Sequence, residues 1–202
     1  MENIHVQING MPLCVPKGTT ILEAARMAGI NIPTLCFLKD INEIGACRMC
    51  VAAVKGARSL GASCVYPLER EGTEVFTNSK KVQDSRRRTL ELILSNHDRN
   101  CLSCSRNGSC ELQQMCADFG VEDASRFDGF NPDLEPDTST LHLVRNNNKC
   151  ILCRRCVAAC NDQFVGVIDA NNRGFDTEMG CAFIKKLADT ACVSCGQCTA
   201  VC

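Results

Sequence analysis

The sequence has no tryptophan, one tyrosine and three histidines among its 202 residues. It also has no run approaching the roughly 18 apolar residues that a membrane span needs. Its first residues, Met1 to Gln7, lack the basic segment and the apolar run of a secretory signal peptide. We therefore expect no membrane span, and a cytoplasmic, reducing location in which disulfides are rare.

Charge of either sign is not in excess, because the formal net charge is −1. The only basic run is Arg86-Arg87-Arg88, which we interpret as a solvated helix face. This pattern predicts no nucleic-acid partner. The sequence also lacks a glycine-rich dinucleotide fingerprint and a P-loop, so we expect no site for nicotinamide, flavin or nucleotide phosphate. These 202 residues are therefore predicted to hold no catalytic site of their own.

Cysteine is the residue in excess, with 18 in the chain. In a reducing compartment such a number points to bound metal rather than to disulfides. The first group has the spacing C-x10-C-x2-C-x13-C in a glycine-rich loop and consists of Cys36, Cys47, Cys50 and Cys64. Four thiolates can hold a [2Fe–2S] cluster, although a zinc site is the alternative for this spacing.

A second group includes a histidine and has the spacing H-x3-C-x2-C-x5-C. Its members are His97, Cys101, Cys104 and Cys110. We predict that they hold a [4Fe–4S] cluster, with a Cys3His zinc site as the alternative. An imidazole in place of a thiolate makes a cluster less negative, which raises its reduction potential.

Two runs with the spacing C-x2-C-x2-C-x3-C repeat the motif of bacterial two-cluster ferredoxins. They comprise Cys150, Cys153, Cys156 and Cys160 in the first run, and Cys192, Cys195, Cys198 and Cys202 in the second. In this motif the fourth cysteine ligates the other cluster. Cys202 is thus predicted to complete the first [4Fe–4S] site and Cys160 the second. Structural zinc sites use four ligands each and do not require two such closely spaced cysteine runs.

The remaining candidate ligands are assigned no metal. We interpret Cys14, Cys116 and Cys181 as structural, since a free cysteine packs as a small hydrophobe. His5 and His142 have no cysteine neighbours at ligand spacing.

The fold class is predicted to be α+β. Alternating apolar residues at 4–8 and 13–15 flank Asn9-Gly10 and predict a hairpin, and a capping box at Thr20 opens a short helix. This order is typical of a β-grasp. Further helices are expected over 79–96 and 111–119, and a turn at 171–174 is expected between short strands within 165–175.

Four segments follow from these patterns. We predict a β-grasp [2Fe–2S] domain at 1–78, a small helical Cys3His [4Fe–4S] domain at 79–127, a linker at 128–140 and a two-cluster [4Fe–4S] ferredoxin domain at 141–202. The last run ends at Cys202 without the proline that usually follows it, which indicates a C-terminal truncation.

The order of these sites resembles the N-terminal relay region of multimeric [FeFe]-hydrogenases. It is also similar to the large iron–sulfur subunit of complex I and to iron–sulfur subunits of NAD-linked formate dehydrogenases and diaphorases. The hydrogenase likeness is carried by the segments 150–160, 171–175 and 195–202. It implies an electron-transfer module, part of an oxidoreductase complex, with flavin-containing, NADH-oxidising iron–sulfur subunits and ferredoxin as partners and an H-cluster domain downstream.

Overall fold

The computed structural model describes residues 2–122, 126–131 and 133–202. The chain divides into two compact units. Unit 1 comprises Met1–Phe37, Glu43–Leu90 and Gly108–Glu122, and unit 2 comprises Leu38–Asn42, Glu91–Asn107 and Asp123–Cys202. Among the helices of the described residues, none is long and apolar enough to cross a membrane.

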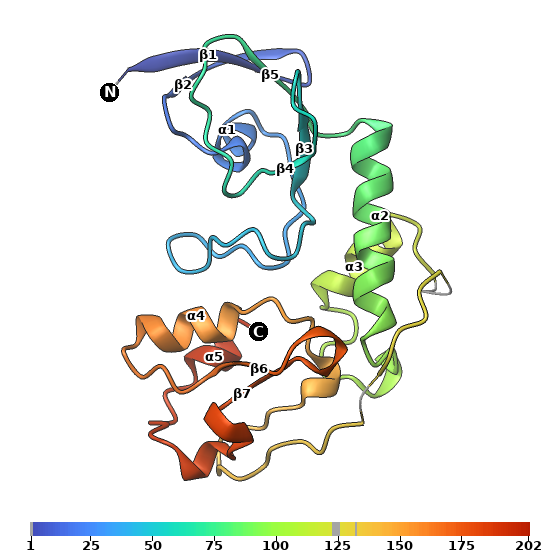
Figure 1. Ribbon diagram of the computed structural model, residues 1–202, viewed down its shortest axis with the longest axis vertical. Helices are drawn as coiled ribbons and strands as arrows, with labels where there is room; N and C mark the ends of the chain where they lie inside the picture. The colour runs from blue at the N-terminus through green and yellow to red at the C-terminus, as the bar shows by residue number, and fades with distance from the viewer. Residues whose placement is uncertain (1, 123–125, 132) are drawn as a thin grey trace. The chain divides into compact units, whose positions relative to one another are not determined.

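Unit 1 contains a five-stranded sheet with the order β2-β1-β5-β3-β4 (Figure 1). Its strands are β1 (Asn3–Ile8), β2 (Met11–Pro16), β3 (Val51–Val54), β4 (Gly61–Ala62) and β5 (Thr73–Phe76). β1 pairs with β2 in antiparallel and with β5 in parallel, and β3 pairs with β4 and β5 in antiparallel. The predicted hairpin is confirmed, with positive φ at both Asn9 and Gly10 as its tight turn requires.

Helix α1 (Ile21–Met27) packs against this sheet and completes the β-grasp (Figure 1). Its predicted capping box is present, because the Glu23 amide donates to Thr20 Oγ1 at 3.2 Å and the Thr20 amide donates to Glu23 Oε2 at 3.4 Å. The helix contributes its buried face to one core shared with β1, β2 and β5. Burial of this apolar face, not helix propensity, is what holds so short a helix.

Helices α2 (Lys80–Ser95) and α3 (Glu111–Asp118) lie within one residue of the predicted bounds. The buried residues of α2 recur every four positions at Val82, Arg86, Leu90 and Leu94. Arg86 is only 3% exposed, so the interpretation of the arginine run as a solvated face was wrong at this position. Arg87 and Arg88 are exposed as expected.

Unit 2 contains helices α4 (Arg155–Asp162) and α5 (Gln197–Ala200) and a two-stranded antiparallel sheet, β6 (Asp169–Asn171) and β7 (Glu178–Gly180). It also has five short 3₁₀ helices in its described residues, namely η1 (Cys101–Ser103), η2 (Asn147–Lys149), η3 (Gly174–Asp176), η4 (Ala182–Ile184) and η5 (Leu187–Asp189). The second strand begins later than predicted because η3 lies between the two strands.

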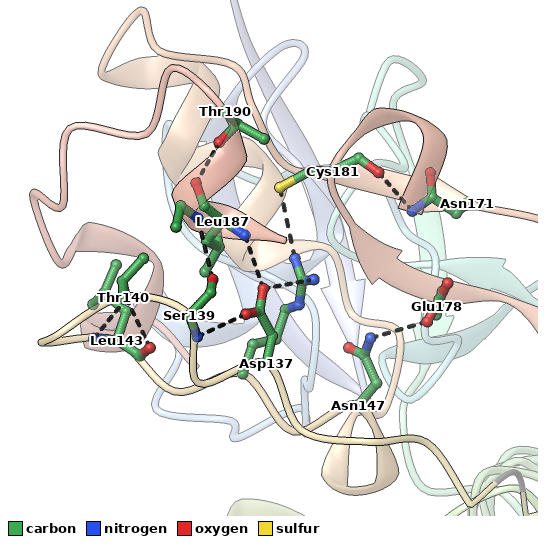
Figure 2. A network of polar contacts seen from close by, with 12 residues as sticks. Asp137, Ser139, Thr140, Leu143, Asn147, Asn171, Glu178, Cys181, Leu187 and Thr190 are labelled. Carbon is green, nitrogen blue, oxygen red and sulfur yellow. Dashed lines mark hydrogen bonds and ion pairs between the residues drawn. The ribbon is translucent and has the colours of Figure 1, made fainter. Parts of the chain in front are cut away.

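A network of polar contacts fixes the C-terminal part of the predicted linker within unit 2 (Figure 2). Asp137 and Arg145 exchange backbone hydrogen bonds of 2.8 and 3.0 Å. The Asp137 carboxylate accepts from the amides of Leu187, at 2.9 Å, and Ser139, at 3.0 Å, and pairs with Arg145 Nη2 at 3.3 Å. Position 132 of this segment lies outside the described residues.

Candidate iron–sulfur sites

The four thiols of the first group come together in unit 1. Cys50 directly precedes β3, and Cys64 follows β4 by two residues, so pairing of these strands brings the two cysteines side by side. Their Sγ atoms lie 3.4 Å apart. The amide of Cys47 donates to Cys36 Sγ at 3.4 Å. Cys36, Cys50 and Cys64 are buried, and Cys47 is half-buried.

The pKa shifts of the four thiols show that they interact as two pairs. A hydrogen bond between the thiols of Cys36 and Cys47 lowers the pKa of Cys47 to about 5 and raises that of Cys36. A hydrogen bond between Cys50 and Cys64 likewise lowers the pKa of Cys50 to about 7 and raises that of Cys64. The pKa of Cys64 is raised further by burial and by the charges of Cys50, Cys36 and Cys47, so all four thiols lie within electrostatic reach.

The loop around these thiols has an unusual backbone. Gly45 has φ +62°, and a Cβ at this position would lie 3.1 Å from Cγ2 of Val65 and 3.3 Å from Cβ of Ala62. Arg48, between Cys47 and Cys50, has φ 59° although it carries a side chain. Left-handed backbone at a non-glycine residue is uncommon and is often found at functional sites.

The second group begins where α2 ends. His97 and Cys104, together with Cys101 at the start of η1, belong to unit 2, whereas Cys110 is the N-cap of α3 in unit 1. His97 Nδ1 is buried and has no hydrogen-bond partner in the described structure. The pKa of His97 is lowered by burial and by the charge of Lys149, against the effects of the Cys150 backbone and Asp98. The neutral imidazole that results is the form that binds metals.

The two repeated runs lie in unit 2, and their thiols interact across the repeat. Burial raises the pKa of Cys150 to about 11, with contributions from the charges of Cys153 and Cys202. The pKa of Cys156 rises to about 12 through burial and the charges of Cys150, Cys153 and Cys202. Cys202 therefore lies near the first run, although its sequence neighbours belong to the second.

The second run shows the reciprocal arrangement. The pKa of Cys198 is raised by burial and by the charges of Cys195, Cys160 and Cys192. Cys160, which ends the first run and lies in α4, is thus near the thiols of the second run. The fourth cysteine of each run is placed with the other run.

Both runs have the same local backbone. The residue before the second cysteine has φ 57° at Leu152 and φ 54° at Ser194. The residue after it has φ 64° at Arg154 and φ 76° at Gly196. In each run a helix, α4 or α5, begins at the following residue. The sequence repeat is therefore also a repeat of conformation.

Comparison with known proteins identifies two iron–sulfur binding regions in the first 125 residues. Residues 1–80 match the 2Fe-2S iron-sulfur cluster binding domain, and residues 86–125 match the NADH-ubiquinone oxidoreductase-G iron-sulfur binding region. A crystal structure of an NAD+-reducing [NiFe]-hydrogenase in the H2-reduced state superposes with a TM-score of 0.85 and 30% identity, covering 94% of this chain and 80% of that chain. The chain belongs to the complex I large iron–sulfur subunit superfamily.

Two curated superfamily members illustrate the relationship. The NADP-reducing hydrogenase subunit HndD of Solidesulfovibrio fructosivorans is 42% identical over 208 residues, covering 100% of this chain and 35% of HndD. The NADH-ubiquinone oxidoreductase 75 kDa subunit of Reclinomonas americana is 34% identical over 187 residues, covering 91% of this chain and 26% of that protein. The chain thus spans about a third or less of these relatives.

The cysteines outside the four groups differ in burial. Cys181 is fully buried and accepts a long contact of 3.8 Å from Arg145 Nη1 (Figure 2), Cys116 is half-buried, and Cys14 is exposed. Burial therefore supports a packing role for Cys181 but not for Cys14. Among the described residues, no three or more His, Cys, Asp or Glu side chains are arranged to hold a single metal ion.

Two polar residues near the thiols of this superfamily member were not singled out from sequence as part of a site. Asn42, 2% exposed, donates to the carbonyl of Cys153 at 3.1 Å within unit 2. Arg86 donates from Nη2 to the carbonyl of Val51 at 2.8 Å within unit 1. Asn42 gives no local signal, because its partner is 111 positions away. Arg86 does give one, since it falls in the row of buried positions along α2.

Proposed function

We propose that this chain is the relay region of a multimeric [FeFe]-hydrogenase catalytic subunit and carries electrons through one [2Fe–2S] and three [4Fe–4S] clusters. The observation that supports the proposal is the grouping of thiols, which form two pairs in unit 1, while in unit 2 Cys202 lies near the first run and Cys160 near the second. The proposed ligands are Cys36, Cys47, Cys50 and Cys64 for [2Fe–2S], and His97, Cys101, Cys104 and Cys110 for the first [4Fe–4S]. Those of the other two are Cys150, Cys153, Cys156 and Cys202, and Cys192, Cys195, Cys198 and Cys160.

The donor chemistry of unit 1 fits the proposed [2Fe–2S] group. A centre with two irons needs two thiolates for each iron, and the thiols form two hydrogen-bonded pairs, Cys36 with Cys47 and Cys50 with Cys64. Grouped thiols resist joint ionisation because burial and mutual repulsion disfavour thiolates. These thiols would need the positive charge of a bound iron centre to ionise together. We assign one pair to each iron.

Protein groups around the thiols would adjust the reduction potential of each cluster. Amide donors to sulfur, from Cys47 to Cys36 at 3.4 Å and from Leu152 to Cys150 at 3.3 Å, offset negative charge and favour reduction. When bound, iron–sulfur clusters supply one-electron storage. The chain itself would position the ligands and exclude water, and no proton transfer is required of it.

Three modules would then follow one another along the chain: 1–78, 79–127 and, after the linker 128–140, 141–202. The partners would be flavin-containing, NADH-oxidising iron–sulfur subunits and ferredoxin, with an H-cluster domain after Cys202 and a cytoplasmic location. An iron–sulfur subunit of a formate dehydrogenase, diaphorase or complex I-like assembly is the second candidate. Coding sequence for an H-cluster domain downstream of Cys202 would favour the hydrogenase, and its absence the second candidate.

Metal analysis tests the cluster assignment directly. Protein prepared without oxygen should contain about 14 iron atoms, with matching acid-labile sulfide at the four proposed sites. Cys47→Ser should lose the [2Fe–2S] signal, whereas the matched control Cys14→Ser, at an exposed cysteine outside the ligand sets, should retain it. Stoichiometric zinc in place of iron, without sulfide, would overturn the proposal.

A further inference from the structure

Arg86 is a buried cation with few partners. The residue belongs to the buried row of α2 and is 3% exposed. Nη2 donates to the Val51 carbonyl at 2.8 Å, whereas Nε is buried and has no hydrogen-bond partner in the described structure. Burying a guanidinium costs free energy unless negative charge or full hydrogen bonding compensates. One carbonyl does not provide that compensation.

The group near Arg86 that can carry negative charge is the thiol of Cys50. Val51, which accepts from Arg86, directly follows Cys50, and both residues are buried. Burial lowers the pKa of Arg86 to about 10, and the charge of Cys50 acts in the opposite direction. In the described parts of the chain, no carboxylate forms an ion pair with Arg86. Its negative neighbour is therefore a proposed cluster ligand rather than an acidic side chain.

We infer that Arg86 tunes the potential of the [2Fe–2S] centre by placing a fixed positive charge beside the Cys50 ligand. The inference rests on the proposed function. One-electron reduction makes the centre more negative by one charge, with no bond formed or broken. A nearby cation stabilises the reduced form more than the oxidised form, so it raises the potential. The Val51 hydrogen bond holds that cation against the strand that begins beside Cys50.

The test compares substitutions at two positions of the same helix. Arg86→Met removes the charge and retains an apolar side chain, Arg86→Lys retains a cation, and Arg88→Met removes an exposed charge of α2 as the control. Each full chain is reconstituted with iron and sulfide, and the [2Fe–2S] potential is measured by redox titration with electron paramagnetic resonance. A unit charge several ångströms away at an effective dielectric constant of about 20 changes such an equilibrium by about tenfold or more.

The expected result is a fall of about tenfold in the reduction equilibrium of Arg86→Met, which equals about 59 mV for one electron. Arg88→Met should match the wild type, and Arg86→Lys should lie nearer the wild type than Arg86→Met does. An intact cluster with an unchanged potential in Arg86→Met would overturn the inference, as would an equal fall in Arg88→Met.

If Arg86→Met does not bind the cluster, the inference is tested with Arg86→Lys instead. Burial lowers the pKa of a lysine, so this variant can lose its charge as pH rises. A potential that falls with pH more steeply than in the wild type supports the inference, and an identical pH dependence refutes it. Failure of the proposed cluster assignment is distinguishable, because the wild type would then hold no [2Fe–2S] cluster at all.

Discussion

Substitution of Asp137 by asparagine should destabilise unit 2 strongly. Asp137 is 8% exposed, and its two carboxylate oxygens receive the amides of Ser139 and Leu187 and the guanidinium of Arg145 (Figure 2). An asparagine offers only one oxygen, so its amide nitrogen faces at least one of these donors. Arg145 also loses its negative partner while its own Nε already has no hydrogen-bond partner in the described structure.

The magnitude follows from these contacts. A hydrogen bond to a charged group contributes about 1.5–3 kcal/mol, and breaking a buried ion pair costs about 3–5 kcal/mol. We expect Asp137→Asn to lower the free energy of unfolding by about 3 kcal/mol. With a urea dependence of about 2 kcal/mol per molar, the midpoint should fall by about 1.5 M.

The measurement is urea unfolding without oxygen, followed by circular dichroism and iron release. The matched control is Asp133→Asn, an exposed acid of the same segment. A midpoint for Asp137→Asn equal to that of Asp133→Asn would refute the reasoning, because the network would then contribute nothing measurable.

The pH dependence of stability gives an independent check on the contribution of the Asp137 carboxylate. Burial raises the pKa of Asp137, but hydrogen bonds from Ser139 and Leu187 and the charge of Arg145 outweigh burial and place it below the usual 3.8. A carboxyl with a lowered pKa stabilises the fold fully above the unfolded value and loses this contribution as pH falls through the folded value. The stability difference between wild type and Asp137→Asn should therefore be constant from about pH 7 to pH 5.

Two further outcomes concern a proposed cluster ligand and the loop around the [2Fe–2S] thiols. Cys160→Ser should abolish the cluster of the second run and retain that of the first. As the control, Cys181→Ser should lose no iron, because Cys181 is fully buried and lies outside every ligand set. Loss of the first run's cluster from Cys160→Ser would contradict the crossed assignment. Gly45→Ala should cost more stability than Gly72→Ala and should release [2Fe–2S] iron faster, since both glycines have positive φ but only Gly45 has neighbours within 4 Å of a new Cβ. Equal effects of the two alanines, measured by thermal unfolding and iron release, would show that backbone conformation alone matters.

Local sequence signals predicted the regular elements well. The hairpin depends on alternation and on Asn9-Gly10, and α1 depends on the Thr20 and Glu23 capping box, all of which act over a few residues. The second strand of unit 2 begins later than the sequence predicts, because the turn residues near Asn171 lead into η3 instead of closing the hairpin directly. A 3₁₀ turn has no apolar period that would announce it.

Burial of the three arginines depends on their positions on the helix and not on their charge alone. Three adjacent arginines favour solvent as a group, but adjacent helical residues point about 100° apart. Val82, Arg86 and Leu90 share one face, and Arg86 is therefore buried while Arg88 is exposed. The apolar period used to predict α2 already contained this information. The buried row of α2 includes position 86 and leaves out positions 87 and 88.

The backbone of the repeated runs could not be read from residue types. Leu152, Arg154 and Ser194 have left-handed φ values, yet only Gly196 among these four positions is a residue suited to them. Left-handed backbone at a residue with a side chain costs roughly 1–2 kcal/mol, and such strain persists where the surroundings over-determine it. Hydrogen bonds supply part of that constraint, including the one from the Leu152 amide to Cys150 Sγ. Ligation through the flanking cysteines would supply the rest, because metal binding free energy is also folding free energy. The strained positions thus lie between the residues proposed to hold iron, where a fixed loop shape is needed most.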